Sequence, residues 1–271
     1  MRSRRRTAAI SVGAGFTVVL VALPITAWLV DGTRPVPAVP VVVPAPPAAS
    51  PGTTVTALPG GGPLPSVRGS AAGGPGPGGP GSGTPRSGRA AQEDPTTTWA
   101  RRTAPRLGMD WRALRAYGRA QLTLRDVAPS CRVTWTTLAG IGWVETRNGT
   151  YASSSVGQDG VVRPTIVGPA LDGAGGRSLV RSTDGGRLDG DTTYDRAVGP
   201  MQFIPSTWRA YGSGNPSDYD AAALAAGRYL CATSRAATPD GWRRAVLAYN
   251  SSDVYVADVY TAAQWYAANS A

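Results

Sequence analysis

The sequence predicts a mainly α-helical domain with one loop-rich insertion, preceded by an N-terminal membrane-anchor helix and a disordered linker. Three observations predict this arrangement. Apolar residues recur at helical spacing behind capping residues from Asp110 onward, an uncharged apolar run covers 8–30, and the segment between them is rich in Pro and Gly. These features divide the chain into a signal anchor at 1–31, a linker at 32–95 and a folded domain at 96–271.

The amino-acid composition excludes several kinds of active site. The chain has no histidine and two cysteines, so Ser-His-acid triads, Cys-His dyads and histidine-based zinc sites are not available. Any catalysis must use carboxylates, hydroxyls, amides, arginine or a bound ion, and we expect no metal and no cofactor. The net charge of +10 comes from arginine alone, because the sequence has no lysine. The arginines are scattered and lack interleaved aromatic residues, so we expect no nucleic acid among the partners.

The N-terminal segment predicts export and a membrane anchor. Arginines within residues 2–6 precede an uncharged apolar run from Ala8 to Val30, which ends at Asp31. A run of about 20 residues can cross the hydrocarbon core, whereas the apolar part of a cleaved signal is usually about 7 to 15 residues long. We therefore expect a single-pass protein of the cell membrane with its folded domain outside the cytoplasm. The alternative is a cleaved signal, for which Ile25–Ala27 is a mediocre site, and a secreted domain.

Residues 32–95 predict a disordered linker. The segment consists mainly of Pro, Gly, Ala, Val and Ser without periodicity, so it cannot bury enough apolar surface to fold. Its proline-dense part at 36–47 favours extended polyproline geometry, and its glycine-rich part at 60–88 is looser. At about 3 Å per residue, such a linker can reach on the order of 100 Å or more. It would let an anchored domain search a thick layer outside the membrane. The alternative is a linker that only connects the two parts and whose length is not under selection.

The first helices of the folded domain are marked by their caps. Asp110 precedes a helix that we expect to run through Asp126, because apolar and aromatic residues recur in it at helical spacing. Thr134 begins a second helix, which carries Glu145 near its C-terminal end and stops at 148–149, where Asn and Gly favour a left-handed turn.

The remainder of the domain alternates between an irregular segment and further helices. Residues 150–195 are rich in turns and poor in core residues, so we expect a long irregular insertion that is either functional or disordered. After it, capping residues and helical spacing predict four helices. These helices are expected at 206–211, at 219–234 behind Asp218, at 241–249 behind Asp240, and from Ser252 to 268.

The two cysteines fit an exported domain. Cys131 precedes the helix that carries Glu145, and Cys231 lies in the helix expected at 219–234. Because disulfides persist in oxidising compartments, we expect these cysteines to be joined. Two buried free thiols are the alternative.

Glu145 is the candidate acid of the domain. The chain has two glutamates, and the other one, Glu93, lies in the expected linker. Apolar surroundings disfavour a charged carboxylate and raise its pKa, which suits a proton donor that works near neutral pH. The alternative is an ordinary surface or capping acid. The apolar residues that precede Glu145 on its helix are Leu138, Ile141, Trp143 and Val144.

Three separated segments resemble one family of enzymes. The segments are Trp-Val-Glu-Thr at 143–146, Ala-Val-Gly-Pro-Met-Gln-Phe-Ile-Pro-Ser-Thr-Trp at 197–208 and Ala-Tyr-Asn at 248–250. Their order and content resemble the lytic murein transglycosylases, and the second segment looks most like the membrane-bound B-type group and its exported actinobacterial relatives. The resemblance extends from about Cys131 to the C-terminus. It implies a lysozyme-like fold for the domain and peptidoglycan glycan strands as the substrate.

The resemblance implies a role for each matching polar position. Glu145 would be the single catalytic acid and base at the bond between N-acetylmuramic acid and N-acetylglucosamine. Gln202 would hold the sugar, since its amide can both donate and accept hydrogen bonds. Gly199 would let the backbone approach the glycan closely, because a Cβ would obstruct it.

The remaining matched positions would line the cleft. Tyr249 and Asn250 would lie near the acid, with the phenol of Tyr249 within reach of its carboxyl. Met201 and Phe203 would form an apolar wall, and a plain core role is an equal alternative for both. The sequence departs from the family where Thr146 replaces the more usual Ser, and where the segment between the first two motifs is unusually rich in Gly and Asp.

The activity implied by the resemblance needs one carboxyl. A lytic transglycosylase cleaves the β-1,4 bond without water and leaves a 1,6-anhydro-N-acetylmuramic acid end, because the C6 hydroxyl of the sugar attacks its own C1. The implied partners are glycan strands and, through the anchor, the membrane. We expect a monomer, which would remain in the cell wall if the signal is cleaved.

The insertion supports two competing interpretations. A hydrolysing muramidase needs a second carboxylate, and the insertion offers several aspartates for that role. The same residues could gather calcium, although their spacing does not match the twelve-residue calcium loop. Solvated turn aspartates are the simplest reading. The aspartates concerned are Asp184, Asp189, Asp191 and Asp195.

A peptidoglycan-binding module without activity is a further alternative for the whole domain.

Overall fold

The structure, a computed structural model, describes residues 93–233 and 236–271. These residues form mainly α-helices, which confirms the predicted class. Within them, no helix is long and apolar enough to cross a membrane. The anchor predicted at 1–31 and nearly all of the linker predicted at 32–95 lie outside the described residues.

The folded domain begins earlier than the sequence indicated. Helix α1 spans Pro95–Thr103, and the carboxylate of Asp94 caps it by accepting hydrogen bonds from the backbone N–H groups of Thr96 and Thr97. Proline is well tolerated at the first helical position, so the composition that resembled a linker is here the start of a helix. Asp94 and Pro95 therefore belong to the folded domain. The short helix η2 (Ala104–Leu107) follows α1.

The next two helices follow the predicted caps. Helix α2 (Trp111–Val127) is capped by Asp110, and helix α3 (Trp135–Thr146) is capped by Thr134. The left-handed turn that ends α3 starts at Arg147, one residue before the predicted stop.

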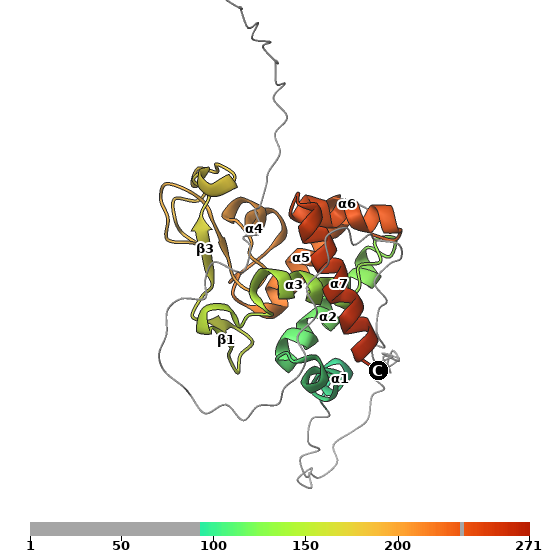
Figure 1. Cartoon of the computed structure of the whole chain (residues 1–271). Helices are drawn as coiled ribbons and strands as arrows, with labels where there is room; N and C mark the ends of the chain where they lie inside the picture. The colour runs from blue at the N-terminus through green and yellow to red at the C-terminus, as the bar shows by residue number, and fades with distance from the viewer. Residues whose placement is uncertain (1–92, 234–235) are drawn as a thin grey trace, which may run out of the picture.

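The insertion contains two small antiparallel sheets. Strand β1 pairs with β2, and β3 pairs with β4 through Val167 opposite Val198 and Ala170 opposite Arg196. Figure 1 shows this part of the chain beside the helices, with β3 and β1 far from α6. The elements are η3 (Tyr151–Ser153), β1 (Ser155–Val156), β2 (Val162–Arg163), β3 (Val167–Ala170), η4 (Ala174–Gly176) and β4 (Arg196–Val198).

The helices predicted after the insertion are present with small shifts. They are α4 (Pro205–Tyr211), α5 (Tyr219–Thr233), α6 (Pro239–Tyr249) and α7 (Asp253–Asn269). The predicted cap of α6 was wrong, because Thr238 Oγ1, not Asp240, accepts the hydrogen bond from Gly241 N. Pro239 again occupies the first helical position, so the helix starts before the residue that the sequence suggested.

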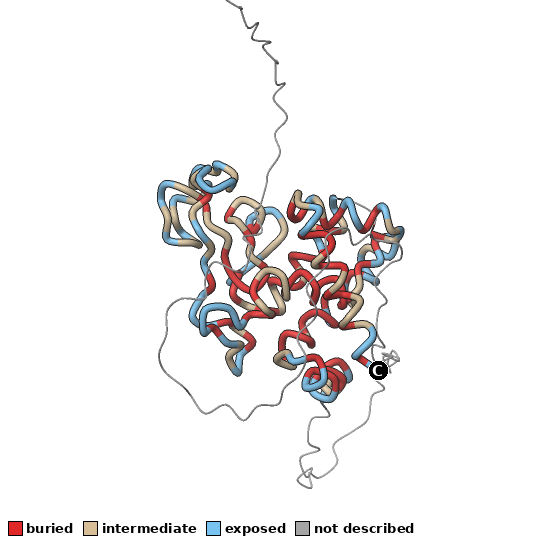
Figure 2. The backbone as a smooth tube through the Cα atoms, in the orientation of Figure 1, coloured by how far each residue is buried: buried red, intermediate tan, exposed pale blue. Residues whose placement is uncertain are grey.

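Helix α3 is the central element of the core. Its residues Trp135, Leu138 and Ile141 are fully buried, as expected for a helix that is apolar on all sides. Helices α3 and α7 pack closely at Gly140, where a Cβ would lie 2.7 Å from the carbonyl oxygen of Val259. Figure 2 shows buried backbone concentrated among the helices and more exposed backbone over the outer loops of the insertion.

The predicted disulfide is present. Cys131, in the turn between α2 and α3, is joined to Cys231 of α5, with an S–S distance of 2.11 Å. The bond therefore ties the approach to α3 to a helix that lies 100 residues later.

Candidate active site

Glu145 lies in the last turn of α3 and is half-buried. Its Oε1 accepts a hydrogen bond of 2.6 Å from the phenol of Tyr255 in α7. Burial raises the pKa of Glu145 from 4.5 to about 7, and the hydrogen bond from Tyr255 opposes part of that increase by lowering it. The carboxyl is thus crowded by protein within a half-buried residue, and both its acid and its base form are populated near neutral pH.

The tyrosine that is hydrogen-bonded to the acid is not the one that the motif suggested. Tyr249 is nevertheless near the acid, because burial and then the charge of Glu145 raise its pKa. The phenol of Tyr249 donates a hydrogen bond of 2.7 Å to the carbonyl oxygen of Met201, whereas Tyr255 contacts the carboxyl of Glu145. Burial, followed by the charge of Glu145, holds the pKa of Tyr255 well above its usual value of 10. Tyr255 therefore remains a hydrogen-bond donor. Sequence reasoning missed it, although Ser252 places it in the first turn of a helix directly after the third motif.

The second motif forms a tight hairpin. Val198 and Phe203 exchange backbone hydrogen bonds of 2.9 and 3.0 Å, so 199–202 make the turn. Thr146 Oγ1 donates a hydrogen bond of 2.7 Å to the carbonyl oxygen of Pro200 in this turn. Since Tyr249 binds the next carbonyl, that of Met201, the three separated motifs meet at two consecutive carbonyls of the hairpin.

Gly199 is required for a reason other than the predicted one. Its φ of 81° lies in the left-handed region, and a Cβ at this position would lie 2.1 Å from the carbonyl oxygen of Pro216. The close approach is thus to the protein's own backbone, and Gly199 is buried.

The other matched residues divide into exposed and buried groups. Among the predicted site residues, Glu145 and Gln202 reach solvent. Met201 and Phe203 are 0% and 3% exposed, so their burial fits the core alternative. Asn250 is also buried, and its Oδ1 has no hydrogen-bond partner among the described residues. A buried acceptor without a partner is uncommon and marks a position where a ligand donor would be favourable.

A buried polar network supports the end of α3. The phenol of Tyr117 donates to Asn148 Oδ1 at 2.9 Å, and Asn148 Nδ2 donates to the phenol of Tyr266 at 2.7 Å. Gly142 makes room for this contact, since a Cβ there would lie 1.9 Å from the Tyr117 phenol oxygen. Nothing in the sequence pattern indicated that Asn148, expected only as a helix stop, joins α2, α3 and α7.

Left-handed backbone is concentrated around the candidate site. Non-glycine residues with positive φ cost energy and are typical of functional sites. Of the six in the described part of the chain, Arg132 (56°) precedes α3, four follow Glu145 within eight residues, and one is in the hairpin. The latter five are Arg147 (53°), Asn148 (55°), Ala152 (52°), Ser153 (65°) and Gln202 (48°).

The aspartates of the insertion are bound within the insertion itself. Asp184 accepts hydrogen bonds from the backbone of Gly186, Arg187 and Leu188. Asp195 is buried and binds Thr183 through both oxygens. Nowhere in residues 93–233 and 236–271 do three or more acidic, cysteine or histidine side chains gather as a metal site would require.

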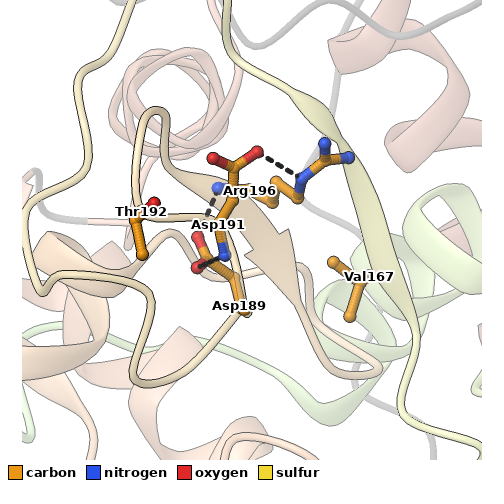
Figure 3. A pocket seen from close by; sticks show the side chains of 6 residues that line it. Val167, Asp189, Asp191, Thr192 and Arg196 are labelled. Carbon is orange, nitrogen blue, oxygen red and sulfur yellow. Dashed lines mark hydrogen bonds and ion pairs between the residues drawn. The ribbon is translucent and has the colours of Figure 1, made fainter.

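A hollow of about 460 Å³ lies in the insertion, apart from Glu145. Figure 3 shows that its walls come from β3 and from the loop that leads into β4. Asp189 and Asp191 accept backbone hydrogen bonds there, from Asp191 N and from Thr193 N and Tyr194 N. These aspartates therefore act as turn caps, as the simplest reading expected. The lining residues are Val167, Asp189, Gly190, Asp191, Thr192 and Arg196.

Comparison of the chain with protein families, with curated proteins and with solved structures finds no match. What the site can do chemically must therefore be inferred from its geometry. One carboxyl with a pKa near neutrality can first donate and then accept a proton.

Proposed function

We propose that this chain is a lytic transglycosylase with a lysozyme-like domain, which cleaves the β-1,4 bond between N-acetylmuramic acid and N-acetylglucosamine in peptidoglycan. The observation that carries the proposal is the environment of Glu145. Glu145 is half-buried, and its carboxyl has a pKa of about 7 and receives a hydrogen bond from Tyr255. The meeting of the three motif segments beside it gives further support.

The proposed reaction uses Glu145 twice. The protonated carboxyl donates its proton to the glycosidic oxygen, so the bond from that oxygen to C1 of N-acetylmuramic acid breaks. The resulting carboxylate then removes the proton of the C6 hydroxyl, and O6 forms a bond to C1. The products are a free hydroxyl on N-acetylglucosamine and a 1,6-anhydro ring, and Glu145 is again protonated. Because Tyr255 occupies Oε1, Oε2 is the oxygen that would exchange protons with the sugar.

Two further side chains would hold the glycan. Gln202 reaches solvent on the hairpin that Thr146 and Tyr249 fix in place. Asn250 offers a buried acceptor without a partner in the described residues, which a sugar hydroxyl or an acetamido N–H could satisfy. Met201 and Phe203 would support this surface from the core.

The proposal includes a location outside the cytoplasm. The basic and apolar segment at 1–31 would anchor the chain in the cell membrane, and the linker at 32–95 would let the domain reach the wall. The disulfide between Cys131 and Cys231 supports an oxidising compartment. A cleaved signal would instead release the domain into the wall.

Mass spectrometry of the soluble products from digested peptidoglycan tests the proposed reaction. Purified protein should release muropeptides that end in 1,6-anhydro-N-acetylmuramic acid and are one water lighter than reducing-end products. Glu145→Gln, which is nearly the same in shape, should fold normally and lose activity by about 100-fold to 10,000-fold.

Other products would overturn the proposal in different ways. Reducing-end products from the wild type would identify a hydrolase of the muramidase type and require a second carboxylate or an activated water. Binding to peptidoglycan without any turnover, unchanged in Glu145→Gln, would identify a binding module.

A further inference from the structure

The insertion meets the motif hairpin along strand β3. The backbone N–H of Gly199 donates a hydrogen bond of 2.8 Å to the carbonyl oxygen of Ile166, directly before β3. Gln202 Nε2 donates to the carbonyl oxygen of Gly199 at 2.9 Å and approaches that of Ile166 at 3.5 Å. The amide nitrogen of Gln202 is thus held by backbone, which fixes where its Oε1 points.

Gly168 of β3 lies against the other end of the same amide. A Cβ on Gly168 would lie 2.9 Å from Gln202 Oε1 and 3.4 Å from the Cβ of Ala197. The backbone of Gly168 is not left-handed, so alanine is allowed there by its φ. The nearest atom is the end of a flexible side chain, so the fold can accommodate alanine by moving the Gln202 amide.

The aspartate-rich loop braces Gly168 from behind. Arg196 Nη1 donates a hydrogen bond of 3.2 Å to the carbonyl oxygen of Gly168, and Arg196 Nε donates one of 2.9 Å to Asp191 Oδ2. The backbone N–H of Arg196 donates to Asp189 Oδ2 at 2.7 Å. Figure 3 shows Arg196 between Asp191 and β3, and Arg196 also lines the hollow.

We propose that the insertion positions the sugar-binding amide of Gln202, with Gly168 as the contact and with Arg196 and Asp191 as its brace. The inference rests on the proposed function, because it assumes that Gln202 binds the glycan. It assigns Asp189 and Asp191 to positioning instead of to catalysis or to calcium. Gly168, Arg196 and Asp191 are positioning residues, since they act through Gln202 and not on the sugar.

Gly168→Ala tests the contact with little cost to the fold. The variant should keep the unfolding temperature of the wild type and lose about threefold to tenfold in kcat/KM, the size expected when one neutral hydrogen bond to the substrate is lost. Adding Gly168→Ala to the inactive Glu145→Gln protein should lower its affinity for soluble glycan oligosaccharides by the same factor. Val167→Ala is the matched control: Val167 is 42% exposed on the outer face of the same strand and lines the hollow, and its variant should match the wild type.

A double-mutant cycle identifies the route of the effect. In a Gln202→Ala background, Gly168→Ala and Arg196→Gln should have no further effect on kcat/KM or on affinity, because the amide that they position is absent. Losses that add to that of Gln202→Ala, or an effect of Val167→Ala as large as that of Gly168→Ala, would overturn the inference. Turnover by the wild type with no effect of Gly168→Ala would overturn the inference and leave the proposed function in place. If the wild type neither cleaves nor binds glycan, the inference and the proposed function are both overturned.

Discussion

The phenol of Tyr255 and the carboxyl of Glu145 form a hydrogen bond of 2.6 Å between residues separated by 110 positions in the chain. This contact joins the last turn of α3 to the first turn of α7. Burial alone would push the carboxyl toward its neutral form, and the bond from Tyr255 favours the charged form. The two effects together place the pKa of Glu145 at about 7.

Removal of the Tyr255 hydroxyl should change the pH profile. Because the hydrogen bond lowers the pKa of Glu145, Tyr255→Phe should raise that pKa and move the alkaline limb of kcat/KM to higher pH. Tyr249→Phe is the comparison, since Tyr249 binds the carbonyl of Met201 and should leave the limb in place. An alkaline limb that does not move in Tyr255→Phe would contradict the role given to this contact.

Glu145 should reduce the stability of the domain at alkaline pH. Its pKa is higher in the folded state than its ordinary value of 4.5, so the folded state binds the proton more tightly. The free energy of unfolding should therefore fall as pH rises from about 4.5 through about 7, by up to roughly 3 kcal/mol. Glu145→Gln should be more stable than the wild type at pH 8 and nearly equal to it at pH 4.

Urea unfolding at both pH values measures this difference. Glu93→Gln is the control for the change in net charge, because Glu93 is exposed and pairs with Arg101 at the surface. A Glu145→Gln variant without extra stability at pH 8 would show that the carboxyl is not destabilised by its surroundings.

Thr146 should stabilise the hairpin through its hydroxyl. Its Oγ1 donates to the carbonyl of Pro200 and accepts from the backbone N–H of Gly149, and both bonds are buried. Thr146→Val leaves both backbone groups without that partner and should cost about 1 to 3 kcal/mol, together with much of the activity. Thr146→Ser keeps the hydroxyl and should retain both properties. A loss in Thr146→Ser but not in Thr146→Val, measured by urea unfolding and product release, would point to packing of the methyl group instead.

Gly142 should tolerate no side chain while Tyr117 keeps its hydroxyl. In Gly142→Ala, the new Cβ would lie 1.9 Å from the Tyr117 phenol oxygen, so we expect a loss of about 1 to 3 kcal/mol. Tyr117→Phe removes the nearest clashing atom and leaves two milder contacts, Asn148 Oδ1 at 2.9 Å and Tyr117 Cζ at 3.1 Å. The double variant should therefore be more stable than the sum of the two single losses predicts. Additive losses in thermal unfolding would mean that the clash is relieved elsewhere.

The disulfide should contribute strongly to stability. Cys131 and Cys231 are 100 residues apart, and a loop of this length corresponds to about 4 to 5 kcal/mol in the chain-entropy account. Reduction should therefore lower the unfolding temperature of the wild type. The same reductant should leave the Cys131→Ser/Cys231→Ser protein unchanged, and an equal response of both proteins would contradict the assignment.

Local signals in the sequence predicted most of the helices. Asp110, Thr134 and Ser252 accept hydrogen bonds from the next turn, as their types and positions indicate. Prediction was wrong where proline precedes a helical pattern. Pro95 and Pro239 each start a helix. Pro95 was assigned to the linker, and the cap expected at Asp240 is in fact Thr238, directly before Pro239.

The candidate site was predictable in its motif residues and not in their supports. Glu145 and Gln202 stand in short motifs, whereas Tyr255, Asn148 and Gly168 act through contacts across 31 to 118 residues. Such contacts depend on how helices pack, and a single sequence carries no periodic or spacing signal for them. The role of Gly199 was misassigned for the same reason, because its close neighbour is the carbonyl of Pro216.

The left-handed residues around Glu145 have a consequence for protein engineering. Replacement of Ala152 by glycine would remove a steric penalty of about 1 kcal/mol or more, so a laboratory selection for heat resistance should enrich glycine there. Glycine in place of Arg147 would instead lose the contact of the guanidinium with the Trp143 ring, whose centroid is 4.3 Å away. Arg147 follows the acid by two residues, and a glycine there would also loosen the turn that holds it. Heat-selected variants of this domain should therefore gain glycine at Ala152 and keep the arginine next to the candidate acid.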